Sequence, residues 1–149
     1  MKIDLAVLGR QYELHAAAYE AAALRALRSG WYIMGPELAA FEDEFAAYTG
    51  AKYAVGLNSG LDALTLSVAA LGIGAGDEVI VPANTYIATV LAVTANRATP
   101  VFVEPDEYYN LDASKLEAAI TERTRAIMPV HLYGQAADMG RMVEIAARH

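Results

Sequence analysis

The sequence predicts an α/β fold in which a mostly parallel sheet is flanked by helices. Short β-prone runs alternate with runs of helical periodicity, and this alternation is typical of parallel strands joined by crossover helices. The expected strands are residues 53–57, 78–81, 99–103 and 125–130. The expected helices between and after them are residues 61–71, 86–96, 112–121 and 138–148. Because the last helix should lead into another strand, we expect the sheet to be incomplete.

Two more helices are expected before the sheet. Residues 11–29 are rich in Ala, Leu and Glu and stop at Gly30, a residue type that commonly terminates helices. Their apolar side chains suggest a surface that packs on a partner or on another part of the protein. Pro36 then stands at a first helical turn, and apolar residues recur at helical spacing as far as Gly50. We therefore expect an arm helix and a second helix with one apolar face.

Composition limits the classes of function. With 149 residues, 56% of them hydrophobic, the chain can bury a core as one compact unit. No run reaches the roughly 18 consecutive apolar residues of a membrane span. Residues 1–4 do not resemble a signal peptide, so we expect a soluble cytoplasmic protein with no membrane partner. Cysteine is absent, and a net charge of −7 with 11 scattered Lys and Arg residues argues against a nucleic-acid partner.

The segment Asn58-Ser59-Gly60-Leu61 joins the first expected strand to a helix. The first N–H groups of a helix have no partner within the helix, and the helix dipole makes their position attractive to an anion. The segment therefore indicates a phosphate site. Serine is also a common helix cap, so Ser59, like Asp138 before the last helix, could serve only to cap its helix.

Polar and aromatic residues also follow two other expected strands. Asn84, Thr85 and Tyr86 follow the second strand, and His131 and Tyr133 follow the fourth. Ligands of open parallel sheets bind beyond the carboxyl ends of the strands, so these side chains could converge on one site. Each also has a structural interpretation. Thr85 could cap a helix, Tyr86 could pack in the core, and a lone histidine such as His131 is more often structural than catalytic.

An acidic segment, residues 104–107, follows the third expected strand. Carboxylates can bind a cation, but no histidine stands nearby to complete a site. We therefore interpret this segment as a solvated turn and predict no metal site.

Several motifs in a fixed order make the chain resemble the DegT/DnrJ/EryC1/StrS family of pyridoxal-phosphate sugar aminotransferases. They lie at residues 29–37 (SGWYIMGPE), 41–42, 58–64 (NSGLDAL), 74–82, 85–89, 98–101 and 131–135 (HLYGQ). The resemblance runs from about residue 11 onward and implies a homodimeric fold-type I enzyme. On this basis residues 1–35 form an arm helix and loop. Residues 36–149 form the front part of the cofactor-binding domain, truncated before the catalytic lysine.

The resemblance also implies which residues hold the cofactor, pyridoxal 5'-phosphate. Ser59, Gly60 and the backbone of Leu61 should hold its phosphate, and Tyr86 should stack on its pyridine ring. The family often has threonine at the position of Leu61. This chain therefore lacks one hydroxyl contact and should depend more on backbone N–H groups.

The implied substrates are an amino donor, expected to be glutamate, and a nucleotide-linked keto sugar. His131, Tyr133 and Asn84 should line the sugar side of the pocket. The form of residues 58–64, together with residues 84–86, resembles the subgroup that aminates carbon 3 of a dTDP-linked 3-keto-6-deoxyhexose.

Transamination needs a lysine that binds the cofactor and moves the proton. The chain has only Lys2, Lys52 and Lys115, and we expect none of them to serve, because the family's lysine falls beyond residue 149. We therefore expect this chain to be inactive by itself. Two alternatives stay open: a dehydratase or regulator of the same family, and a small phosphate- or nucleotide-binding α/β domain without catalysis.

Overall fold

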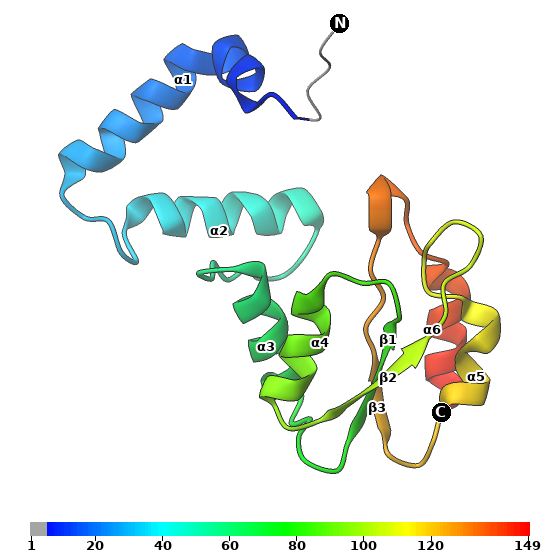
Figure 1. Cartoon of the computed structure of the whole chain (residues 1–149). Coiled ribbons are helices and arrows are strands. Elements are labelled where there is room, and N and C mark those ends of the chain that lie inside the picture. The colour runs from blue at the N-terminus through cyan, green and yellow to red at the C-terminus, as the bar shows by residue number, and fades with distance from the viewer. Residues whose placement is uncertain (1–5) are drawn as a thin grey trace, which may run out of the picture. The chain divides into compact units, whose positions relative to one another are not determined.

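The computed structural model describes residues 6–149, and the chain divides into two compact units, Met1–Gly56 and Leu57–His149. We call them the N-terminal unit and the sheet unit, and each is described by itself (Figure 1). Our interpretations of residues 1–4 and of Lys2 lie outside the described residues. In residues 6–149 no helix is both long enough and apolar enough to cross a bilayer.

The N-terminal unit contains the two helices that its sequence predicts. Helix α1 spans Leu8–Ser29 and helix α2 spans Pro36–Thr49, with proline at the start of α2. Both helices end at a glycine in the left-handed region, Gly30 with φ 67° and Gly50 with φ 71°. Only glycine adopts that conformation without a steric penalty, so the chain leaves each helix at the expected residue.

The strand predicted at residues 53–57 was wrong. No strand is formed there, and the side chains of Tyr53 and Val55 are 75% and 74% exposed. A β-prone run becomes a strand only where a neighbouring backbone completes its hydrogen bonds. None of the segments that the structure describes pairs with this run.

The sheet unit is built on three parallel strands: β1 (Glu78–Pro82), β2 (Thr99–Val103) and β3 (Thr124–Ile127). Their order is β2-β1-β3, so β1 is central. The helices of this unit are α3 (Gly60–Ala70), α4 (Ile87–Ala95), a 3₁₀ turn η1 (Ala113–Lys115), α5 (Leu116–Ala119), a second 3₁₀ turn η2 (Leu132–Gly134) and α6 (Met139–Arg148). The predicted α/β class and parallel pairing are confirmed.

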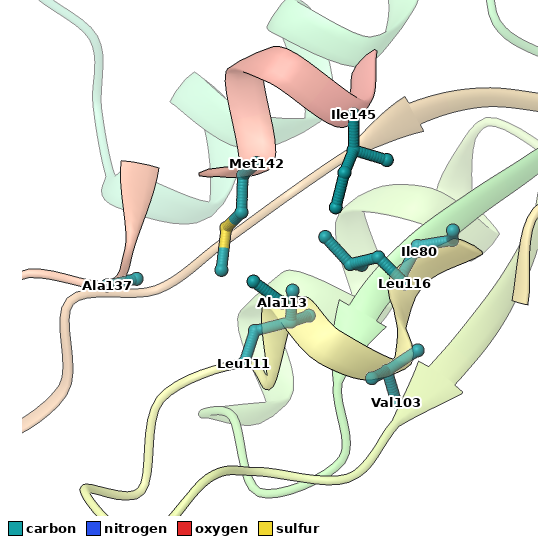
Figure 2. Packing of buried hydrophobic residues seen from close by; sticks show 8 residues of the cluster. All are labelled: Ile80, Val103, Leu111, Ala113, Leu116, Ala137, Met142 and Ile145. Carbon is teal, nitrogen blue, oxygen red and sulfur yellow. The ribbon is translucent and has the colours of Figure 1, made fainter. Parts of the chain in front are cut away.

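The three layers follow from the alternation of side chains along β1. Val79 and Val81 belong to one buried cluster with Val68 of α3 and Val93 of α4. Ile80 lies between them in sequence and belongs to a second cluster with Leu116, Met142 and Ile145, which Figure 2 shows packed between the sheet and helices α5 and α6. Successive strand residues point to opposite faces, so β1 needs helices on both sides.

This topology creates a switch point next to the central strand. β1 leads into α4 on one face of the sheet, and the adjacent strand β3 leads through η2 into α6 on the other face. Figure 1 shows α3 and α4 together on one side of the strands, with α5 and α6 on the other. Two neighbouring strands whose connections part in this way leave a crevice at their carboxyl ends, where α/β proteins bind ligands.

Candidate functional site at the carboxyl edge of the sheet

Helix α3 begins at the segment predicted to hold a phosphate. Ser59 has an extended backbone and its hydroxyl accepts a hydrogen bond from the N–H of Asp62 at 3.1 Å, so the expected cap is present. The side chain of Asn58 donates to the Asp62 carboxylate at 3.1 Å. The N–H groups of Gly60 and Leu61 have no partner among the described residues. The exposed start of α3 therefore offers unused donors.

The start of α4 differs from its sequence-based prediction in one detail. Thr85 does not cap the helix, because Tyr86 is the residue at the cap position and the Thr85 hydroxyl instead bonds the hydroxyl of Thr89 at 2.7 Å. The Tyr86 side chain is 76% exposed, which excludes the alternative that it packs in the core of this unit. Both α3 and α4 run antiparallel to β1, so Tyr86 and Gly60 stand at the same edge of the sheet.

His131 and Tyr133 lie where β3 leads into α6. The N–H of Ala137 donates to Nδ1 of His131 at 3.0 Å, and Ala137 is buried in the cluster of Figure 2. Tyr133 has φ 55° and its ring meets that of Tyr109 edge to face at 5.8 Å between centroids. A bulky residue with positive φ is strained and persists only where its surroundings hold it.

The turn after β2 is more than a solvated acidic turn. The carboxylate of Asp106 accepts from the N–H of Tyr108 at 2.8 Å and from that of Asn110 at 3.0 Å. The carbonyl of Tyr109, which has φ 67°, accepts from the side chain of Asn84 at 2.9 Å. This turn therefore connects the end of β2 to the segment that follows β1.

Asn110 extends the same turn toward the segment that follows β3. Its side chain is buried, with 1% exposure, and its Oδ1 accepts from the N–H of Leu132 at 3.0 Å. Its Nδ2 donates to the carbonyl of Gln135 at 3.2 Å. Sequence reasoning missed Asn110. The available signal was an aspartate followed four residues later by an asparagine, because such side chains commonly bond nearby backbone in turns.

The predicted site residues thus form two groups. Asn84, His131 and Tyr133 are joined through the turn of Tyr109 and Asn110. The second group consists of Ser59, Gly60, Leu61 and Tyr86, at the starts of α3 and α4 on the same edge of the sheet. No hydrogen bond among the described residues joins the two groups.

The lysine of the sheet unit is engaged in an ion pair near this edge. Lys115 lies 3.1 Å from the Asp112 carboxylate at the start of η1. The hydroxyl of Ser114 donates to the same carboxylate at 2.6 Å. This hydrogen bond, opposed by desolvation and aided by Lys115, holds the pKa of Asp112 below its usual value. Lys52, in the N-terminal unit, stands over the ring of Tyr53 at 5.1 Å.

Comparison with known proteins decides the family. The profile of the DegT/DnrJ/EryC1/StrS aminotransferase family matches residues 15–149. The chain belongs to this family. It is 53% identical over 148 residues to the dTDP-3-amino-3,6-dideoxy-alpha-D-galactopyranose transaminase of Aneurinibacillus thermoaerophilus. This alignment covers 99% of this chain and 40% of that transaminase.

Solved structures of other family members have the same fold. DesV of Streptomyces venezuelae, in complex with a reaction intermediate, aligns with a TM-score of 0.96 and 55% identity over 99% of this chain and 40% of its own. A sugar aminotransferase of Streptococcus pneumoniae in its PLP form aligns with a TM-score of 0.79 and 41% identity, covering 82% of this chain and 31% of that one. The chain therefore spans about two fifths or less of the length of these aminotransferases.

Proposed function

We propose that the protein carrying this chain is a pyridoxal-phosphate-dependent nucleotide-sugar aminotransferase. It would move an amino group, from glutamate in our proposal, to a keto sugar such as a dTDP-3-keto-6-deoxyhexose. Membership of an aminotransferase family supports the reaction class. The 53% identity to a transaminase named for a dTDP-3-amino-3,6-dideoxy sugar supports the substrate class.

The start of α3 fits the phosphate of the cofactor. The free N–H groups of Gly60 and Leu61 lie at the positive end of an 11-residue helix, where they can donate to phosphate oxygens. Ser59 can donate its hydroxyl proton to the same group while its oxygen accepts from Asp62. A Cβ placed on Gly60 would meet no atom within 4 Å, so the approach to this backbone is open.

The exposed ring of Tyr86 fits a stacking role. Its position at the cap of α4 leaves the ring outside the core, where it can cover one face of a flat heteroaromatic ring. Bound pyridoxal phosphate would supply an electron sink beside the substrate amine. Asn84, His131 and Tyr133 would contact the sugar from the adjoining turns.

We also propose that this chain does not transaminate by itself. Lys115 is paired with Asp112, and Lys52 contacts the ring of Tyr53. A homodimer is part of the same proposal, and it is supported by exposed apolar side chains on α1 such as Leu14 and Leu27, which are 78% and 61% exposed. Light scattering of the protein at the length of its relatives tests the dimer.

The proposed reaction is tested with two purified samples: the protein at the length of its relatives, and this chain alone. Both are mixed with pyridoxal phosphate, glutamate and dTDP-3-keto-6-deoxyglucose, and the sugar product is identified by mass spectrometry. The longer protein should yield an amino sugar and this chain should not. Loss of a sugar hydroxyl without amination would indicate a dehydratase and would contradict the proposal, as would phosphate binding without any conversion of the sugar.

A further inference from the structure

We propose that Asn110 is a positioning residue that fixes His131 and Tyr133 at the carboxyl edge of the sheet. Asn110 belongs to the turn after β2, yet its side chain bonds only the backbone of the segment after β3, at Leu132 and Gln135. These two contacts are 22 and 25 residues away in sequence. The asparagine therefore joins the ends of two strands that are not neighbours in the sheet.

The geometry of the segment 131–137 depends on this join. Leu132 follows His131 directly, and Gln135 lies between Tyr133 and the buried Ala137. With its N–H and carbonyl held by one buried amide, the segment can keep Tyr133 at φ 55° and bring the N–H of Ala137 to 3.0 Å from His131 Nδ1. Strained backbone of this kind needs such external support.

The contact with Ala137 decides which nitrogen of His131 carries the proton. Nδ1 accepts a hydrogen bond from a backbone N–H, so a neutral imidazole must hold its proton on Nε2. His131 thereby becomes a hydrogen-bond donor through Nε2. Asn110 acts on the site only through this loop, and it contacts neither His131 nor Tyr133 by a side-chain hydrogen bond.

The turn of Asn110 also reaches the third member of the group. The preceding residue, Tyr109, accepts from Asn84 through its carbonyl and touches Tyr133 with its ring. One turn therefore sets the mutual positions of Asn84, His131 and Tyr133. If these residues contact the sugar, which rests on the proposed function, Asn110 determines the shape of the sugar side of the site.

The contacts of Asn110 with Leu132 and Gln135 are tested first by nuclear magnetic resonance of the chain, which needs no measurement of enzyme activity. In the wild type, the Leu132 and Ala137 amides should exchange slowly, and the His131 ring nitrogens should show a single neutral form protonated at Nε2. In Asn110→Ala we expect the Leu132 amide to exchange at least about tenfold faster, and the His131 spectrum to show both neutral forms. Asn110→Asp keeps the acceptor for Leu132 and should be intermediate.

Asn96→Ala is the matched control. Asn96 is a half-buried asparagine whose Nδ2 donates to two backbone carbonyls, those of Thr65 at 3.0 Å and Ala92 at 2.9 Å. It ends α4 at the opposite end of the helix from Tyr86. The control should lose a similar amount of stability and leave the His131 spectrum unchanged. If Asn110→Ala does not fold, the proposal is tested by the His131 spectrum of Asn110→Asp and by the amide exchange rates of the wild type.

The consequence for catalysis is measured in the protein at the length of its relatives. Asn110→Ala should lower kcat/KM for the keto sugar by roughly 10- to 100-fold, because small displacements of positioning groups are costly, while the cofactor affinity changes little. A wild-type Leu132 amide that exchanges as freely as an open loop would overturn the proposal. So would an unchanged His131 spectrum in Asn110→Ala, or an equal change in Asn96→Ala. Absence of transamination would refute the proposed function but leave the spectroscopic result standing.

Discussion

The same substitution, serine to alanine, should have different effects on stability at the cap of helix α3 and inside the helix. Ser59 stands at the cap position and accepts from the Asp62 N–H at 3.1 Å. Ser67 lies inside the helix and donates to the Ala63 carbonyl at 2.7 Å. Both serines are exposed, so neither change opens a cavity in the core.

Ser59→Ala should lower the free energy of unfolding by about 1 kcal/mol, because the Asp62 N–H loses its acceptor. Ser59→Gly should cost only a few tenths of a kcal/mol, since glycine at a cap leaves that N–H open to water. Ser67→Ala should be neutral or should stabilise by no more than about 0.5 kcal/mol, because alanine is the better helix former. A loss of 1 kcal/mol corresponds to a fall in Tm of roughly 4 °C.

Urea unfolding followed by circular dichroism measures these differences. The expected order of stability is Ser67→Ala, then Ser59→Gly, then Ser59→Ala. Equal losses in the two alanine variants, or a glycine variant as unstable as Ser59→Ala, would refute the capping argument. In titrations with pyridoxal phosphate, Ser59→Ala should also weaken binding by about tenfold through loss of a hydrogen bond to a charged group, whereas Ser67→Ala should bind normally.

Three further predictions concern other parts of the sheet unit. Tyr86→Ala should leave thermal stability unchanged, because the ring is 76% exposed. The same variant should bind pyridoxal phosphate about fivefold more weakly in a fluorescence titration, because roughly 1 kcal/mol of stacking is lost. Tyr86→Phe keeps an aromatic ring and should bind normally. Thr121→Val should destabilise the chain by about 1.5–3 kcal/mol in urea, because Thr121 donates at 2.6 Å to the carboxylate of buried Glu78. Ser114→Ala should make the stability of the folded chain less sensitive to acid. The depressed pKa of Asp112 stabilises the folded chain at pH values above the pKa of a free aspartate. This contribution is lost as the pH falls through the folded pKa of Asp112. Urea midpoints are measured at one pH above the pKa of a free aspartate and at one pH below the folded pKa of Asp112. The difference between these two midpoints should be smaller in the variant than in the wild type.

Features that depend on neighbouring residues were predictable from the sequence. Gly30 and Gly50 end their helices as expected, and Ser59 and Asp138 cap theirs. Strand β2 has its predicted bounds, residues 99–103, because the short β-prone run Val101-Phe102-Val103 stands there between two turns. Each of these signals is read within a few residues, where backbone preference and hydrogen bonding are decided locally.

Features that depend on distant residues were decided by the tertiary structure. The apolar run 53–57 has the composition of a strand, but no described strand pairs with it to complete its backbone hydrogen bonds.

The sequence by itself determined the α/β class, the family and the polar residues that follow strands β1 and β3. It could not place Asn110, whose function in the fold depends on carbonyl and N–H groups more than 20 residues away. A buried amide must find partners somewhere, and which partners it finds is fixed only when the sheet brings the ends of its strands to one edge.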